Sequence, residues 1–200
     1  PRHAMTTLTA GLFAMLVAAA FVTPDLVAQN LSERGFLAVV VALALFGALR
    51  TYAIYPAIFA AIAAVGGIRI LTFGAASPGF LSSDVLYTDP NLVIWLALGL
   101  GLFFALLALA TVFLRRASHP EFVRVWIVLG AVTPLVLAAF SFFFFGNYAF
   151  DLKHGLYAVL LGLLFLGGAL AFYGEAEREG RFDINRDLLA AASWAAFVFA

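Results

Sequence analysis

The sequence lacks cysteine and has few charged residues. Without cysteine, disulfide bonds, thiolate metal ligands and cysteine nucleophiles are all excluded. Charged residues make up 11% of the 200 residues, whereas about a quarter of an ordinary soluble chain is charged. Because so few charges cannot cover a surface that faces water, a water-soluble globular architecture is excluded.

The few charges balance, since 11 basic and 11 acidic residues give a formal net charge of zero. Proteins that bind nucleic acid neutralise its phosphates with clustered lysine and arginine, so we expect no nucleic-acid partner. The three histidines, His3, His119 and His154, show no metal-ligand spacing. We therefore expect no metal site and no cofactor.

Apolar residues are abundant: they form 65% of the chain and give it a mean hydropathy of +1.08. A membrane-spanning helix needs about 20 apolar residues, and a helix satisfies its own backbone hydrogen bonds in lipid. Polar segments separate seven apolar runs, at residues 6–22, 36–49, 53–73, 91–114, 123–145, 155–173 and from 188 onward. We predict an all-α, polytopic transmembrane helix bundle with six complete spans and a truncated seventh.

The two ends of the sequence add a further expectation. The chain begins with Pro1, and its last run, Leu188 to Ala200, is too short to cross a hydrocarbon layer of about 30 Å. We expect residues 1–200 to form one transmembrane region of a longer protein. Its expected partners are the lipid bilayer and other membrane helices, either of the same chain or of an oligomer.

The second and third runs admit two interpretations, because only the short connector 50–52 separates them. Either residues 35–70 form a tight helical hairpin, or one of the two runs is re-entrant; we favour the hairpin. Asn30 or Ser32 can cap the second helix and start it early. Asp89 as a cap, followed by Pro90 in the first turn, likewise predicts the start of the fourth helix.

Basic residues predict the orientation, since cytoplasmic loops carry an excess of lysine and arginine. One side of the predicted bundle has eight arginines, and the other has Arg34, Arg69 and Lys153. The eight are Arg2, Arg50, Arg115, Arg116, Arg124, Arg178, Arg181 and Arg186. The N-terminal end, the connectors near Arg50 and Arg115, and the segment 175–187 are therefore predicted to face the cytoplasm. The loop 74–90 is predicted to face outward.

Several aromatic residues lie near predicted helix ends, where amphipathic rings prefer the membrane interface. They are Trp95, Trp126, Tyr52, Tyr148, Tyr157 and Tyr173. Asp151, Lys153 and His154 are predicted to form a polar cap at the same interface. The segment Glu175 to Asp187, in which charges alternate in sign, is predicted to be a solvated connector with local ion pairs.

Small residues recur at intervals of four in two predicted helices, which lets helix backbones approach closely in lipid. They are Ala57, Ala61, Ala63 and Gly67 in the third helix, and Ala97, Gly101 and Ala105 in the fourth. We interpret these rows as static packing; the alternative is a moving interface of a transporter.

Pro134 is predicted to kink the fifth helix, because it removes the hydrogen bond to the carbonyl of Gly130. Discontinuous helices mark some transporter sites. An inward-facing polar stripe would favour transport, and the main polar residues at mid-helix are Thr133 and Ser141.

Arg69 is the one formal charge well inside an apolar run, so it needs a partner or a route to the interface. It can snorkel outward, and Asp84 or Asp89 on the same predicted side can pair with it. We interpret the three residues as a structural ion pair. The alternative is an anion, substrate or transferase site at the outer surface, with the carboxylates as general bases or metal ligands.

Several segments resemble a large bacterial family of predicted membrane proteins, a domain of unknown function with the number twenty-three thirty-nine. The resemblance extends over residues 36–174 and is carried by Ile68–Phe73, Asn91–Trp95, Leu114–Arg116, Ala139–Phe142 and Gly155–Tyr157. It implies a long polytopic chain. It supplies no activity and no functional residues.

Three functions follow as hypotheses. The first is a non-enzymatic envelope or scaffold protein of the bacterial cytoplasmic membrane. The second is a transporter for a small or lipidic solute. The third is a membrane-embedded transferase, which a surface cleft containing Arg69, Asp84 and Asp89 would favour.

Overall fold

The computed structural model describes residues 30–50, 54–73, 90–115, 120–145, 152–179 and 184–200, and within these ranges it is helical without strands. The all-α class predicted from the sequence is confirmed. The helices are α3 (Asn30–Leu49), α4 (Ile54–Phe73), α5 (Pro90–Arg115), α6 (Pro120–Phe145), α7 (Leu152–Glu179) and α8 (Ile184–Phe199). The chain divides into two compact units, residues 1–97 and 98–200, with the boundary inside α5.

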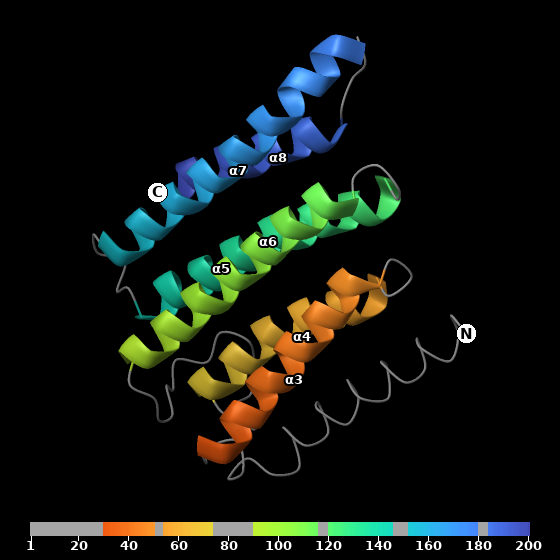
Figure 1. Cartoon of the computed structure of the whole chain (residues 1–200). Coiled ribbons are helices and arrows are strands. Elements are labelled where there is room, and N and C mark those ends of the chain that lie inside the picture. Colours follow the sequence, from red (N-terminus) through yellow and green to blue (C-terminus); the bar gives the residue numbers. More distant parts are fainter. Residues whose placement is uncertain (1–29, 51–53, 74–89, 116–119, 146–151, 180–183) are drawn as a thin grey trace. The chain divides into compact units, whose positions relative to one another are not determined.

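In the first unit, α3 and α4 lie side by side (Figure 1). A Cβ atom added to Gly47 would lie 2.8 Å from the Cβ of Ala57 and 2.9 Å from its backbone nitrogen. Glycine at position 47 therefore permits the contact between the two helices. α3 begins at Asn30, so the second helix starts early as predicted, and the packed pair agrees with the helical hairpin.

In the second unit, later residues of one helix contact earlier residues of the next. Gly101 and Ala108 of α5 meet Pro134 and Gly130 of α6, respectively. Ser141 of α6 meets His154 of α7. Between α7 and α8, Gly162 contacts Phe197 and Gly168 contacts Leu189. Each pair of consecutive helices is thus antiparallel, as short connections require.

Three described helices are long and apolar enough to cross a membrane: Asn91–Leu114, Glu121–Phe145 and Leu152–Phe172. The described parts of α3 and α4 hold shorter apolar segments, Leu37–Leu49 and Ile54–Ile68. The predicted span at residues 6–22 lies outside the described residues. Three spans agree with the sequence, and the full count of six and a truncated seventh stays a prediction.

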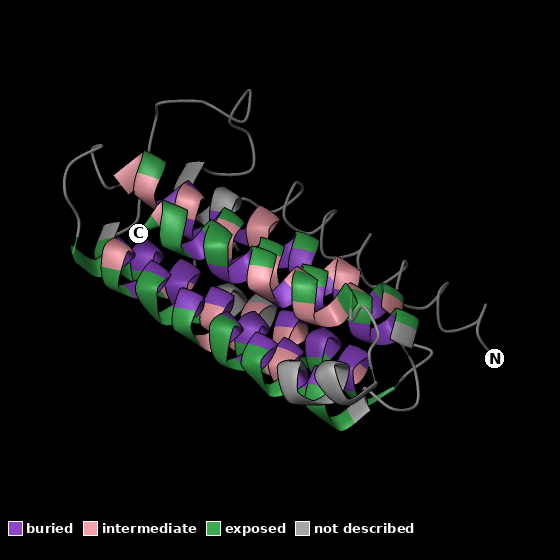
Figure 2. Ribbon diagram, turned by 90° about the horizontal axis from the view of Figure 1, so that it is seen from above, coloured by how far each residue is buried: buried purple, intermediate pink, exposed green. Residues whose placement is uncertain are grey.

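Each described helix has a buried face and an exposed face, which alternate along the ribbon with the helical period (Figure 2). The exposed faces carry large apolar side chains, among them Leu114, Leu152, Trp194 and Val198. Such faces suit contact with lipid, and the buried faces contain the small residues at which helices approach one another.

The segment between the last two helices differs from the prediction. α7 continues to Glu179 and α8 begins at Ile184, so most of the predicted connector 175–187 is helical. Glutamate and arginine are good helix formers, and they extend α7 beyond its apolar part. Arg186 and Asp187 form a local ion pair, with 2.8 Å between Nη2 and Oδ1.

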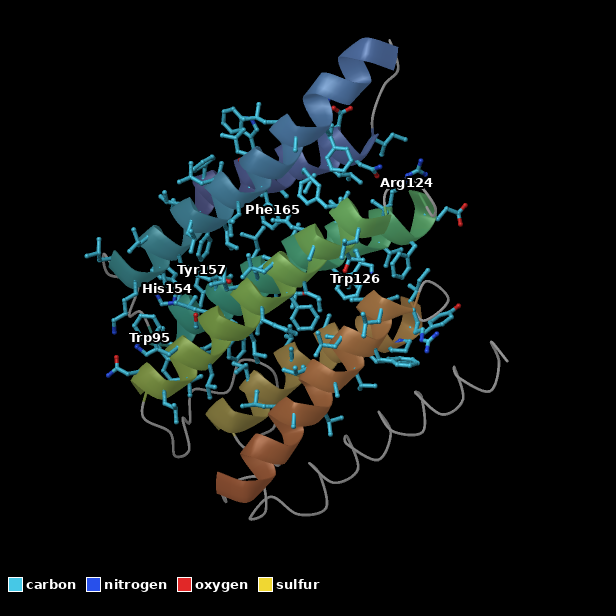
Figure 3. All side chains as sticks on the ribbon, viewed as in Figure 1. Trp95, Arg124, Trp126, His154, Tyr157 and Phe165 are labelled. Atoms are coloured by element: carbon cyan, nitrogen blue, oxygen red, sulfur yellow. The ribbon has the colours of Figure 1, made fainter. Side chains whose placement is uncertain are left out.

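Two of the aromatic residues predicted at the interface lie in the protein interior. Trp126 is completely buried, and Tyr157 is only 7% exposed. Trp95 is 60% exposed, in keeping with an interfacial position (Figure 3 labels all three). A position near a helix end predicts how deep in the membrane a residue lies. Whether its side chain contacts lipid or protein depends on the face of the helix that carries it.

Candidate functional site

The polar pair Ser141 and His154 joins the last turns of α6 to the first turn of α7. The distance between Ser141 Oγ and His154 Nε2 is 2.8 Å, and both residues are buried. His154 had been predicted as part of an interfacial polar cap with Lys153 and Asp151. Lys153 is exposed and Asp151 lies outside the described residues, but His154 packs inside the bundle.

The hydrogen bonds of Ser141 indicate which ring nitrogen of His154 carries a proton. The serine hydroxyl donates to the carbonyl oxygen of Ala138, 3.0 Å away. A hydroxyl has one proton to donate, so its oxygen accepts the second hydrogen bond from the Nε2–H of His154. The Phe142 ring and the imidazole also pack edge to face, with ring centroids 5.5 Å apart.

Tyr157 lies about one helical turn beyond His154 on α7 (Figure 3). Its hydroxyl is buried and has no hydrogen-bond partner in the described part of the chain. A Cβ atom added to Gly101 would overlap this hydroxyl and would lie 2.9 Å from the Cα of Pro134. Side chains or backbone from α5, α6 and α7 thus converge at one point.

The buried face of α6 carries further polar groups. Trp126, Gly130, Thr133, Pro134 and Ser141 share this face at helical spacing, and all five are buried. The indole Nε1 of Trp126 has no hydrogen-bond partner among the described residues. The two mid-helix polar residues noted in the sequence, Thr133 and Ser141, therefore both face inward.

Two more buried hydroxyls bond to backbone carbonyls. Thr111 Oγ1 donates to Leu107 of the same helix at 2.7 Å. Ser193 Oγ of α8 donates to Gly162 of α7 at 2.9 Å. The first bond is local, whereas the second joins α8 to α7, and each hydroxyl has donated its one proton.

The site residues predicted from charge fall largely outside the described part. Arg69 belongs to α4, four residues before its end at Phe73, and its side chain is not among those described. Asp84 and Asp89 lie outside the described residues. The ion pair thus stays a prediction. Within the described ranges, no group of three histidine, cysteine or acidic residues could hold a metal ion.

Sequence reasoning missed the pairing of Ser141 with His154 and the convergence of Gly101, Pro134 and Tyr157. A signal for the first was available: Ser141 lies four residues before the end of α6 and His154 two residues after the start of α7. In an antiparallel helix pair, residues so placed come to similar depth.

Comparisons with known proteins return no match to a protein-family model, a curated protein or a solved structure.

Proposed function

We propose that this chain is a multi-pass integral membrane protein of the bacterial cytoplasmic membrane with a structural, non-enzymatic role in the cell envelope. The observation that carries the proposal is the contact of α5 with α6 at Ala108 and Gly130, where a Cβ on Gly130 would overlap that of Ala108. Helices hold together in lipid mainly by such close packing. A tightly packed bundle suits a permanent structural element.

The orientation is tested by single-cysteine labelling, for which the cysteine-free chain is well suited. In intact cells, an impermeant thiol reagent should label Ser83→Cys and should leave Ser118→Cys unlabelled until the membrane is opened. The reverse pattern would overturn the orientation. Release of the protein from membranes by alkaline carbonate would overturn membrane insertion itself.

The second candidate is a transporter for a small or lipidic solute. It is favoured by the buried polar face of α6 together with His154 and Tyr157 of α7. Polar side chains inside a membrane bundle mark substrate pathways in many transporters. Pro134, in the middle of that face, adds a possible point of movement.

Two variants separate these functions in cells that lack the native copy. Ser141→Ala with Tyr157→Phe removes polar atoms at little cost in volume, whereas Gly130→Leu disrupts packing. For a structural role, envelope resistance to detergent follows the amount of folded protein in the membrane, so each variant reduces it only as far as it lowers that amount. Transport predicts that the polar variant loses more function than its membrane level accounts for.

The transferase hypothesis depends on Arg69, Asp84 and Asp89 gathering at the outer surface, and it is addressed by the Arg69 experiment below. Membership of the domain-of-unknown-function family likewise stays a prediction. It would place the chain within a longer polytopic protein.

A further inference from the structure

The contact point of α5, α6 and α7 contains a hydroxyl without a partner. Tyr157 is more than nine-tenths buried, and its hydroxyl has no hydrogen-bond partner among the described residues. Burying a hydroxyl without a hydrogen bond is unfavourable, because the group gives up its bonds to water. A phenylalanine would fill the same space without this penalty. We therefore looked for a hydrogen-bond acceptor that the hydroxyl can reach when the helices are arranged differently.

The neighbouring helix offers an acceptor. Pro134 has no backbone N–H, so the carbonyl of Gly130 lacks its usual donor four residues further along α6. Prolines are tolerated in membrane helices because groups on neighbouring helices satisfy the carbonyls that they free. Gly101 brings the two together, since the space beside its Cα is shared by the Tyr157 hydroxyl and the Cα of Pro134.

Two serine hydroxyls on this side of the bundle already donate to backbone carbonyls. Ser141 donates to Ala138 and bonds to His154. Ser193 donates to Gly162. Among the described residues, Tyr157 has the only buried hydroxyl without a hydrogen-bond partner.

We propose that α6 bends at Pro134, which acts as a hinge, and that a hydrogen bond from the Tyr157 hydroxyl holds the bent form. We call this hydroxyl the latch. In the arrangement described, the latch is open, and the hydroxyl packs against Gly101. In the second arrangement, α6 bends at Pro134, and the hydroxyl donates to the carbonyl of Gly130. This conformational device is independent of whether the bundle is structural or transports a solute.

The first test is a double-mutant cycle on the full chain in detergent, with thermal unfolding as the readout. Tyr157→Phe should lower the melting temperature when Pro134 is present. It should not lower it in the Pro134→Ala background, where the restored N–H satisfies the Gly130 carbonyl. An equal effect of Tyr157→Phe in both backgrounds, or a rise in both, would overturn the proposal.

A distance measurement tests the hinge directly and does not require Pro134→Ala to fold. Spin labels at Phe143→Cys of α6 and Leu106→Cys of α5 both occupy exposed positions. Phe143 lies about 14 Å beyond Pro134 along the helix, so a bend at the proline moves it by several ångströms relative to α5. The latch predicts two distances with Tyr157 present and one in Tyr157→Phe. A single distance in both proteins, or two distances in both, contradicts it.

Discussion

The hydroxyl oxygen of Ser141 lies 2.8 Å from Nε2 of His154, inside the bundle and between two helices that the chain connects directly. Interhelical hydrogen bonds of this kind contribute about 0.6 kcal/mol on average in membrane proteins, with a maximum of about 1.7. The main effect of the pair is thus to set how α6 and α7 are aligned along their axes, and its contribution to stability is small.

A double-mutant cycle at this pair should give a coupling free energy in that range. Ser141→Ala and His154→Phe are each expected to lower the stability in detergent, because each leaves a buried polar group without its partner. The double variant should lose less than the two single variants together. Strictly additive losses would mean that the hydrogen bond contributes nothing to the folded state.

Gly130→Ala should destabilise the protein by about 1–3 kcal/mol, because its new methyl group overlaps that of Ala108. Ala108→Gly should restore most of the loss, since the nearest remaining atom, the carbonyl oxygen of Phe104, is 3.5 Å from the added Cβ. Thermal unfolding of the two single variants and the double variant measures this. No rescue in the double variant would show that α5 and α6 do not meet at these residues.

Gly99 and Gly101 provide a matched pair on one helix. Nothing lies within 4 Å of a Cβ added to Gly99, whereas one added to Gly101 meets Tyr157 and Pro134. Gly99→Ala should therefore raise stability by up to about 1 kcal/mol through helix propensity, and Gly101→Ala should lower it. If both substitutions raise the melting temperature, Gly101 faces lipid.

Arg69 tests the remaining charge prediction. If it forms a structural ion pair with Asp84 or Asp89, Arg69→Ala should destabilise the protein by a few kcal/mol. Removing the partner acid as well should restore part of the loss, and a double-mutant cycle with each aspartate identifies the partner. Single variants of unchanged stability that nevertheless fail in an envelope assay would favour the transferase hypothesis.

Much of the helical framework follows from the sequence, because each run of apolar residues needs internally bonded backbone in lipid. Pro90 begins α5, as expected of a proline in the first helical turn. The row containing Gly101 is confirmed as a point of close approach. These features depend on local chemistry, which one sequence displays directly.

The candidate site could not be predicted to the same extent. With apolar residues on all sides of a helix, the hydrophobic pattern does not identify the protein-facing side. Trp126 and Tyr157 were therefore expected at the interface although they are buried. The sequence does not predict that α7 extends through the charge-rich segment 175–179, because the apolar pattern ends before the helix does.

The contrast among the three tryptophans has a spectroscopic consequence. Trp126 is fully buried and packs edge to face with Phe122, whereas Trp95 and Trp194 are 60% and 73% exposed. In bilayers that contain brominated acyl chains, collisions with bromine quench the fluorescence of lipid-facing indoles and spare those shielded by protein. The unquenched emission thus comes from Trp126 and reports the packing around the buried face of α6 without any added label.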